Sequence, residues 1–238
     1  MRVPEELVLV VGGEESNGAS QVIDLQNENR SCQLENYPRS RVITPSGGVL
    51  DNFPVVCGGH DSRITYKECN KFEHSTKKWK RFAQLPEPRT DHAIVAMDNS
   101  LWITGGDDKQ KYDHAYKTTE FLFSNGTVKQ GPDLPYGLKR HCMVKLDDGK
   151  VMLISGEIED NNFVRPSDYQ KKVLIYDPKQ QSFKESPKMK YDRRHHTCAI
   201  FHSPRHGGRP IVMVAGGDHH QVEVLDYTKP DAKWEESK

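Results

Sequence analysis

Residues 53–92 read FPVVCGGHDSRITYKECNKFEHSTKKWKRFAQLPEPRTDH, and this stretch decides the fold. It opens with an apolar run that ends in the glycine pair Gly58-Gly59. Two aromatic residues, Phe72 and Trp79, then flank a polar turn, and a proline-rich segment closes the stretch with Arg89 and His92. An apolar run that stops at two glycines is typical of a short strand entering a tight turn.

The glycine pair is the first of three repeated signals. Its copies are Gly12-Gly13, Gly58-Gly59, Gly105-Gly106, Gly216-Gly217 and the degenerate Ser155-Gly156. The first three copies are 46 and 47 residues apart. The last two intervals are longer because they contain extra residues, at positions 159–168 and 203–210. A period of this length indicates a repeat architecture rather than a single thick core.

The second signal is a pair of large apolar residues seven positions apart, on either side of a polar turn. The pairs are Phe72 and Trp79, Tyr176 and Phe183, Tyr227 and Trp234, with Leu25 and Cys32 in the first copy. In the third copy Phe123 and Val128 flank Asn125-Gly126, which is a strong hairpin signal. Each repeat therefore predicts four short strands, and we expect Trp79 and Trp234 to be core residues.

The third signal begins with a Leu or Met. A loop follows, which contains proline in two copies, and the signal ends with an Arg and a His. The Arg and His residues are Arg89 with His92, Arg140 with His141, and Arg193 with His196. Together the three signals resemble the kelch repeat, and the resemblance covers essentially all of residues 1–238. The approximate repeats are 5–41, 42–91, 92–140, 141–195 and 196–238. Copies one and four depart from the pattern at Cys32 and Ser155.

The kelch resemblance implies an all-β fold, a β-propeller with about five four-stranded blades. The first copy opens directly on the strand before Gly12, so one blade is expected to lack its inner strand. Because a closed propeller leaves no open sheet edge, we expect a fragment of a six-bladed ring. A five-bladed ring that closes with a missing strand is the alternative.

The resemblance also implies a protein-interaction scaffold, because related kelch domains bind partners where the post-glycine loops and the proline-rich loops open. The candidate binding residues are Arg39, Arg41, His60, Arg63, Arg89, Asp107, Arg140, Arg193, Arg194, His219 and His220. One interpretation is a ring of arginines that binds an acidic protein or peptide by bidentate pairing. The other is that these arginines tie neighbouring blades together through acidic loops that include Glu14, Glu15 and Glu157.

Charge and composition argue against several other functions. Lys+Arg and Asp+Glu are 34 each, which favours neither nucleic acid nor a membrane surface as partner. The longest apolar run, residues 7–11, is far too short to span a membrane, and we expect no signal peptide in the chain. Compartment, cytoplasmic or extracellular, and oligomeric state stay open.

We expect no catalytic residues, no metal and no cofactor. Adjacent histidines on a strand point to opposite faces, so His195-His196 and His219-His220 each offer at most one ligand to a site. The alternative is an enzyme that resembles the galactose oxidases or the sugar-isomerising enzymes of the same fold. Fold analogy alone does not establish an activity.

Five cysteines leave at least one without a partner in the chain. Cys57 ends one expected strand and Cys69 enters the next, so an antiparallel pairing could bring them within disulfide distance. Some invertebrate kelch-like proteins look similar at this point, although buried free thiols are also common. We expect Cys142 and Cys198, on inner strands, to be small core residues.

Overall fold

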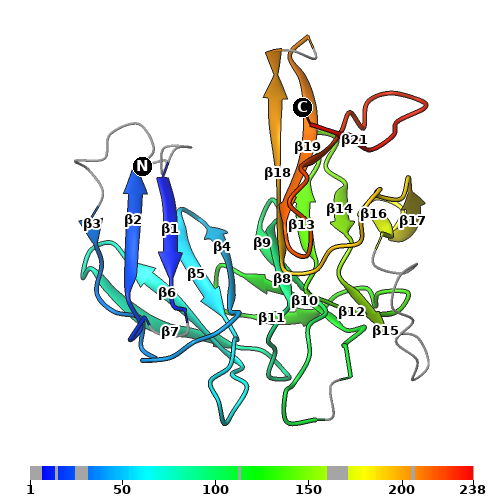
Figure 1. Cartoon of the computed structure of the whole chain (residues 1–238). Helices are drawn as coiled ribbons and strands as arrows, with labels where there is room; N and C mark the ends of the chain where they lie inside the picture. Colours follow the sequence, from blue (N-terminus) through cyan, green and yellow to red (C-terminus); the bar gives the residue numbers. More distant parts are fainter. Residues whose placement is uncertain are drawn as a thin grey trace. The chain divides into compact units, whose positions relative to one another are not determined.

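Short antiparallel strands account for the regular structure of this protein, shown as a computed structural model in Figure 1. The structure describes residues 7–13, 16–24, 32–111, 114–159, 171–204 and 207–237. Within these ranges the chain forms strands and no α-helix, so the all-β prediction is confirmed, and no membrane-spanning helix occurs among them. The chain divides into two units, the first of residues 1–103, 107–114 and 120–131, and the second of residues 104–106, 115–119 and 132–238.

The first unit contains three sheets. The first sheet is β1 (Leu7–Val11), β2 (Ser20–Asp24) and β3 (Cys32–Gln33), in that order. The second sheet is β4 (Ser46–Leu50), β5 (Phe53–Cys57), β6 (Glu68–Glu73) and β7 (Lys78–Gln84). The third sheet is β8 (Ala93–Ala96), β9 (Ser100–Thr104), β10 (Thr119–Phe123) and β11 (Val128–Gln130). Among the described residues the first sheet has three strands and no counterpart of β4 or β8.

The second unit contains two four-stranded sheets. The fourth sheet is β13 (Cys142–Lys145), β14 (Val151–Ile154), β16 (Val173–Asp177) and β17 (Ser182–Ser186). The fifth sheet is β18 (His196–Ser203), β19 (Arg209–Gly216), β20 (Glu223–Leu225) and β21 (Glu235–Glu236). A short ladder of β12 (Gly137–Lys139) and β15 (Glu157–Glu159), which the sequence did not predict, completes this unit.

Two of the three spaced aromatic pairs lie opposite each other across the outer hairpins, whereas Tyr227 and Trp234 lie outside the paired residues of β20 and β21. Phe72 is paired with Trp79 in the second sheet and Tyr176 with Phe183 in the fourth. In the third sheet Leu122, not Phe123, lies opposite Val128, because the Asn125-Gly126 hairpin shifts the register by one residue. Leu25 of the first copy and residues 160–168 of the first insertion lie outside the described residues.

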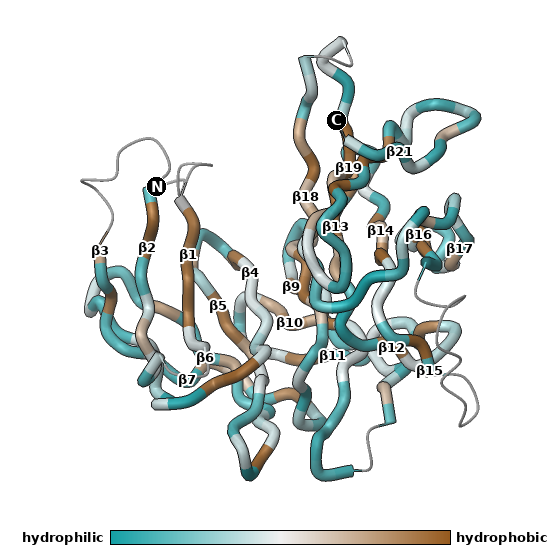
Figure 2. The backbone as a smooth tube through the Cα atoms, in the orientation of Figure 1, coloured by the Kyte–Doolittle hydropathy of each residue, from teal (hydrophilic) through white to brown (hydrophobic). Residues whose placement is uncertain are grey.

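Each sheet contributes its apolar strands to a thin core, and the brown segments of Figure 2 follow these strands. Trp79 and Trp234 are 7% and 3% exposed, so both are core residues as predicted. Their indole N–H groups donate to Ser20 Oγ (3.1 Å) and to the Pro187 carbonyl (2.9 Å), respectively. These bonds satisfy the polar end of each ring, as burial of Trp requires.

The cysteines form two disulfides. Cys57 and Cys69 lie directly opposite on β5 and β6, fully buried, and are linked, as one of the two interpretations of the sequence expected. Cys142 on β13 is linked to Cys198 on β18, which corrects the expectation that these residues are separate core side chains. The expectation failed because it treated each inner strand alone, whereas β13 and β18 lie side by side in the second unit. Cys32 is a free and exposed thiol.

We predict that both disulfides form when the protein is produced under oxidising conditions. Peptide mapping without reduction should recover Cys57 linked to Cys69 and Cys142 linked to Cys198, with Cys32 as the only thiol that is alkylated after unfolding. Since the two bonds close loops of 12 and 56 residues, their loss should lower the free energy of unfolding by about 3 and about 4 kcal/mol, respectively. Recovery of three or more alkylated cysteines from the unreduced protein would contradict this pairing.

Candidate functional site

The loops that follow the glycine pairs are joined to the proline-rich loops by backbone hydrogen bonds. In the first unit His60, which follows Gly59, exchanges two bonds with Ile43, at 2.8 and 3.0 Å. Asp107 exchanges two bonds with Thr90, at 2.9 and 3.0 Å. In the second unit Glu157 pairs with Lys139 where β15 meets β12. Each unit therefore brings its two classes of loop to one end of its sheets.

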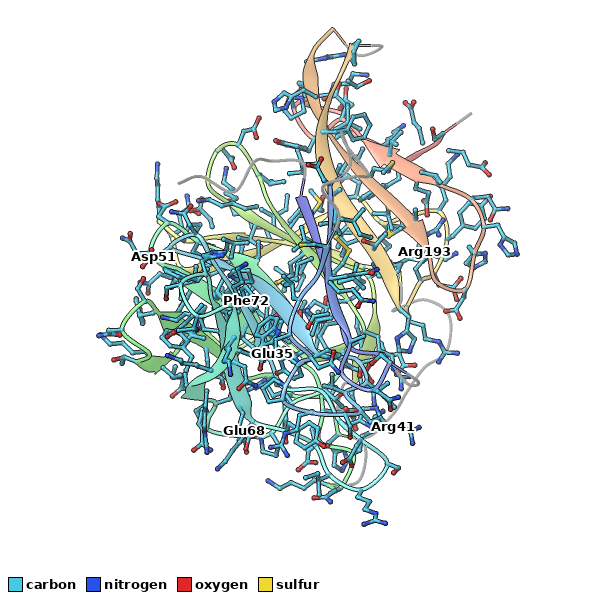
Figure 3. All side chains as sticks on the ribbon, turned by 90° about the vertical axis from the view of Figure 1, so that its left-hand side faces the viewer. Glu35, Arg41, Asp51, Glu68, Phe72 and Arg193 are labelled. Carbon is cyan, nitrogen blue, oxygen red and sulfur yellow. A yellow bond between two sulfur atoms is a disulfide. The ribbon has the colours of Figure 1, made fainter. Side chains whose placement is uncertain are left out.

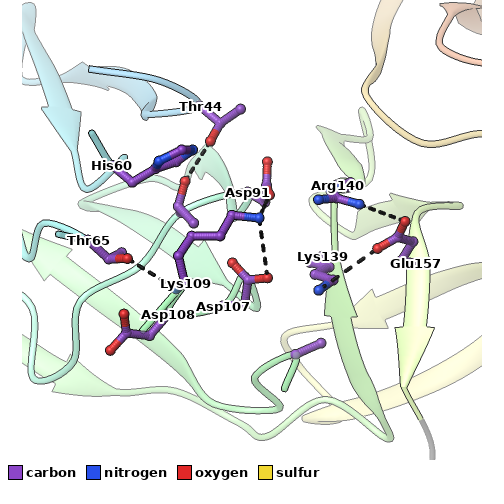
Figure 4. Close-up of polar contacts among 12 residues, drawn as sticks. Thr44, His60, Thr65, Asp91, Asp107, Asp108, Lys109, Lys139, Arg140 and Glu157 are labelled. Atoms are coloured by element: carbon purple, nitrogen blue, oxygen red, sulfur yellow. Dashed lines mark hydrogen bonds and ion pairs between the residues drawn. The ribbon is translucent and has the colours of Figure 1, made fainter. Parts of the chain in front are cut away.

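In the first unit the side chains at this end form a closed polar network (Figure 4). The Lys109 ammonium lies 3.3 Å from Asp91 Oδ2 and 3.9 Å from Asp107 Oδ2. The hydroxyl groups of Thr44 and Thr90 are 2.5 Å apart. The Asp107 side chain is completely buried, so this candidate binding residue supports the loop rather than facing solvent.

In the second unit Glu157 is shared by three cations, and Figure 4 shows two of them, Lys139 and Arg140. Its carboxylate lies 2.7 Å from Arg140, 2.6 Å from Arg194 and 3.9 Å from Lys139. Burial alone would raise the pKa of Glu157, but the hydrogen bond from Arg194 and the charge of Arg140 outweigh it and hold the pKa below its usual value. Arg194 also lies 3.3 Å from Asp218. Arg140 and Arg194 are thus occupied by acidic loop residues, as the structural interpretation expected.

Arg89 and Arg193 are completely buried. The Arg89 guanidinium is paired with Glu120 inside the first unit. Arg193, labelled in Figure 3, donates from Nε to Glu223 at 3.1 Å and also to the carbonyls of Gly216 (2.8 Å) and His219 (3.2 Å). The hypothesis of an exposed recognition ring is therefore wrong at Arg89 and Arg193, which hold sheets and loops together.

The sequence pattern placed Arg140 at the same repeat position as Arg89 and Arg193, and the structure corrects this. In the first four copies, the second residue of the glycine pair donates its backbone N–H to a loop carbonyl, at 2.8–3.0 Å. The donor and acceptor pairs are Gly13 and Val42, Gly59 and Arg89, Gly106 and Leu138, and Gly156 and Arg193. Leu138, two residues before Arg140, is therefore the counterpart of the buried arginines. Arg140 instead corresponds to Asp91 and His195, and all three have positive φ, at 59°, 54° and 55°.

The sequence did not identify Glu120 and Glu223 as the partners of the buried arginines. Both occupy the position that Leu174 holds on β16, so the fourth sheet has leucine where the third and fifth have glutamate. Leu138 and Leu174 are 2% and 4% exposed. Three successive copies of the repeat thus carry Arg with Glu, Leu with Leu and Arg with Glu at matching positions. This correlation becomes apparent once the structure has fixed the register of the repeats.

The histidine that follows each of these loops is buried beneath the glycine pair. A Cβ atom on Gly58 would lie 2.8 Å from His92 Cε1, and His141 Nε2 is 2.8 Å from Thr104 Oγ1. His196 Nε2 donates to the Ile154 carbonyl at 3.1 Å. Burial lowers the pKa of His92 to about 3 and that of His196 to about 4, and nearby arginine charge adds to the shift. His92 and His196 are therefore neutral structural groups at physiological pH.

The remaining candidates differ in exposure. Arg39 lies 3.4 Å from Glu68 and stacks over the Tyr66 ring, and Arg41 is half-buried. His219 lies 3.3 Å from Asp192. The exposed candidates are Arg63 and His220. Glu14 and Glu15 lie outside the described residues. No group of three or more His, Cys, Asp or Glu that could hold a metal occurs within the described part of the chain.

We predict that Arg193→Ala and Arg194→Ala have very different effects on stability. Removing Arg193 leaves Glu223 buried and unpaired, which should lower the free energy of unfolding by about 3–5 kcal/mol. Removing Arg194, whose side chain is 43% exposed, should cost less than about 1 kcal/mol. Urea denaturation of both variants measures the difference.

The double variant Arg193→Leu with Glu223→Leu copies the pair at Leu138 and Leu174. It should recover most of the stability lost in Arg193→Ala, because no buried charge remains. Equal destabilisation by the Arg193 and Arg194 variants would show that the buried pair has no structural role.

We predict that stability falls as the pH drops below 6.5. The unfolded chain binds protons at His92 and His196 with an ordinary pKa near 6.5, whereas the folded protein does so only near the lowered values of about 3 and about 4. The free energy of unfolding should therefore decrease by about 1.4 kcal/mol per pH unit and per histidine between pH 6.5 and pH 4. In melting curves from pH 7.5 to pH 4.5, His196→Gln should reduce this slope, and His220→Gln, at an exposed position, should leave it unchanged.

Comparison with known proteins gives relatives of modest identity. No family model matches the chain. Kelch-like protein 40 of Xenopus tropicalis is 24% identical over 199 residues, which cover 78% of this chain and 30% of that protein. The tRNA wybutosine-synthesizing protein 4 of Candida albicans is 30% identical over 176 residues, covering 66% and 24%. Kelch repeat and BTB domain-containing protein 1 of vaccinia virus is 27% identical over 146 residues, covering 60% and 24%.

The fold is shared with a solved structure titled "Structure of YjhT", with a TM-score of 0.75 at 14% sequence identity over 100% of this chain and 82% of that one. This chain spans only 24–30% of the length of the relatives named above. Three phased repeat signals, the sheets that they form and the kelch relatives agree. The chain contains kelch repeats and is a kelch-type β-propeller protein.

Proposed function

We propose that this chain is a protein-interaction module rather than an enzyme, and that it binds a protein or peptide on the loops that follow the glycine pairs and on the proline-rich loops. The observation that supports this most is the backbone pairing of the two loop classes, at His60 with Ile43 and at Asp107 with Thr90. Loops fixed in this way lose little freedom when a partner binds, and this lowers the entropic cost of association.

The polar side chains of the loops support the same function. Glu157 and Asp91 hold Arg140 and Lys109 in ion pairs that are partly open to solvent. Charged groups arranged in this way favour recognition of a complementary partner surface. The larger relatives have their own partners and activities, and this chain matches only about a quarter to a third of their length. The proposal therefore does not rest on those partners or activities.

The histidines and carboxylates also favour binding over catalysis. His92 and His196 are buried and neutral, and His141 contacts Thr104. A general base needs a pKa near the working pH and access to substrate, and none of these three histidines combines the two. The carboxylates of Glu120 and Glu223 are taken up by buried arginines.

Photo-crosslinking tests the proposal. A crosslinking amino acid replaces His60 or His220 in the loops, or Asn52 or Gln180 in turns at the β4–β5 and β16–β17 hairpins. Peptides selected against the purified protein from an unbiased display library should crosslink from the two loop positions and not from the two turn positions. Crosslinks confined to Asn52 or Gln180, or failure of the library to yield any binder, would contradict the proposed function.

A further inference from the structure

Arg63 is distinguished from the other candidate arginines by having an exposed and unpaired side chain. Arg39, Arg140 and Arg194 each lie within ion-pair distance of a carboxylate, and Arg89 and Arg193 are buried. No ion pair to Arg63 occurs within the described part of the chain, and its side chain is exposed. Its neighbour Ile64 is 43% exposed, one of only a few large apolar side chains so open to solvent among the described residues.

The loop that carries Arg63 and Ile64 is held rigid by Asp61. Asp61 Oδ1 accepts hydrogen bonds from the backbone N–H groups of Arg63 (2.6 Å) and Ile64 (2.8 Å). The Tyr66 hydroxyl donates to Asp61 Oδ2 at 2.6 Å. These hydrogen bonds, that from Tyr66 foremost, lower the pKa of Asp61 to about 2, so the carboxylate stays charged at neutral pH.

A second loop of the same unit braces the first. The backbone N–H of Lys109 donates to Thr65 Oγ1 at 3.1 Å, and the Gln110 side-chain amide donates to the Arg63 carbonyl. The main chain on both sides of Ile64 is thus fixed by bonds from outside the turn. An arginine and an aliphatic residue on a fixed loop can bind without a large ordering cost.

The charges around Arg63 favour an acidic ligand. The carboxylates of this region are already engaged, since Asp61 accepts from the backbone and Asp91 and Asp107 lie beside Lys109. Asp108 is 3% exposed and accepts from the Gln110 N–H at 3.1 Å. The exposed guanidinium of Arg63 is therefore free to pair with an incoming negative charge.

We propose that Arg63 and Ile64 form the anchor for a short acidic and apolar peptide segment, in which an Asp or Glu carboxylate pairs with Arg63 and a neighbouring Leu, Ile or Phe side chain packs on Ile64. The proposal rests on the proposed binding function and names the chemistry of the partner. Arginine forms bidentate bonds to carboxylates, and an arginine beside an apolar contact is typical of the residues that dominate binding energy at interfaces.

A synthetic peptide array tests the anchor with defined probes. It contains four classes of 12-residue peptide: acidic with apolar residues, acidic only, apolar only, and basic with apolar residues. Titration of the best peptides should show preference for the first class. Arg63→Ala should weaken this binding by about 10- to 100-fold, as expected for a lost charge-assisted bond, and Ile64→Ala by about 10-fold.

Matched controls separate the anchor from general effects. Arg81→Ala, at an exposed position on β7, and Val49→Ala, at an exposed position on β4, should leave affinity unchanged. Arg63→Glu should abolish binding of the acidic peptide and gain binding of the same peptide with its acidic residues changed to Lys. Unchanged melting temperatures in all variants show that folding is preserved.

Three outcomes would overturn the anchor. They are equal binding by wild type and Arg63→Ala, binding that does not depend on the acidic residues of the peptide, and absence of binding to every acidic and apolar peptide. If library-selected peptides crosslink from the loops at His60 or His220 while Arg63→Ala has no effect, the proposed function stands and the anchor alone fails.

Discussion

In the first four copies of the repeat, the backbone contact between the glycine pair (Ser155-Gly156 in the fourth copy) and the carbonyl of the following loop is the constraint on which the other features depend. A Cβ atom on Gly58 would lie 2.2 Å from the Arg89 carbonyl oxygen, and one on Gly105 would lie 2.0 Å from that of Leu138. No side chain fits there, and Gly58 and Gly105 have φ of 64° and 60°, which disfavour any residue with a side chain. The hydrogen bond from the second residue of the pair then fixes where the loop turns into the next inner strand.

This constraint explains how a chain of low hydrophobicity forms an ordered fold. Hydrophobic residues are 34% of the sequence, and the cores within the sheets are correspondingly thin. The hydrogen bonds from Gly59 and Gly156 hold the backbone carbonyls of Arg89 and Arg193. This positions the two arginine side chains inside the protein, where they pair with Glu120 and Glu223, respectively. Buried ion pairs of this kind fix one arrangement more than they add stability, and the leucines at 138 and 174 show that apolar residues can replace them.

The hydrogen bonds between the glycine pairs and the loops also fix the loops at the ends of the sheets. These loops carry many charged side chains, but not all of those side chains are available for binding. Most of the charged groups there, including Asp107, Glu157 and Arg194, bind one another. Recognition of a partner by these loops therefore depends on the few side chains that are exposed and make no ion pair within the described part of the chain. Arg63 and Ile64 meet this condition because Asp61, Tyr66 and the neighbouring loop satisfy the backbone around them.

The sequence by itself determined the repeat, the four strands of the second to fifth sheets and the buried role of Trp79 and Trp234. These features follow from local periodicity, turn chemistry and side-chain size, and each of these properties can be read from residues that are close together in the sequence. Only the tertiary structure decided that Arg89 and Arg193 are buried, that Arg140 has a different register and that Cys142 is linked to Cys198. The partners in these cases are 30 to 56 residues apart. An arginine in a loop looks the same in sequence whether it faces solvent or a glutamate on another strand, and only the packing of the sheets distinguishes the two.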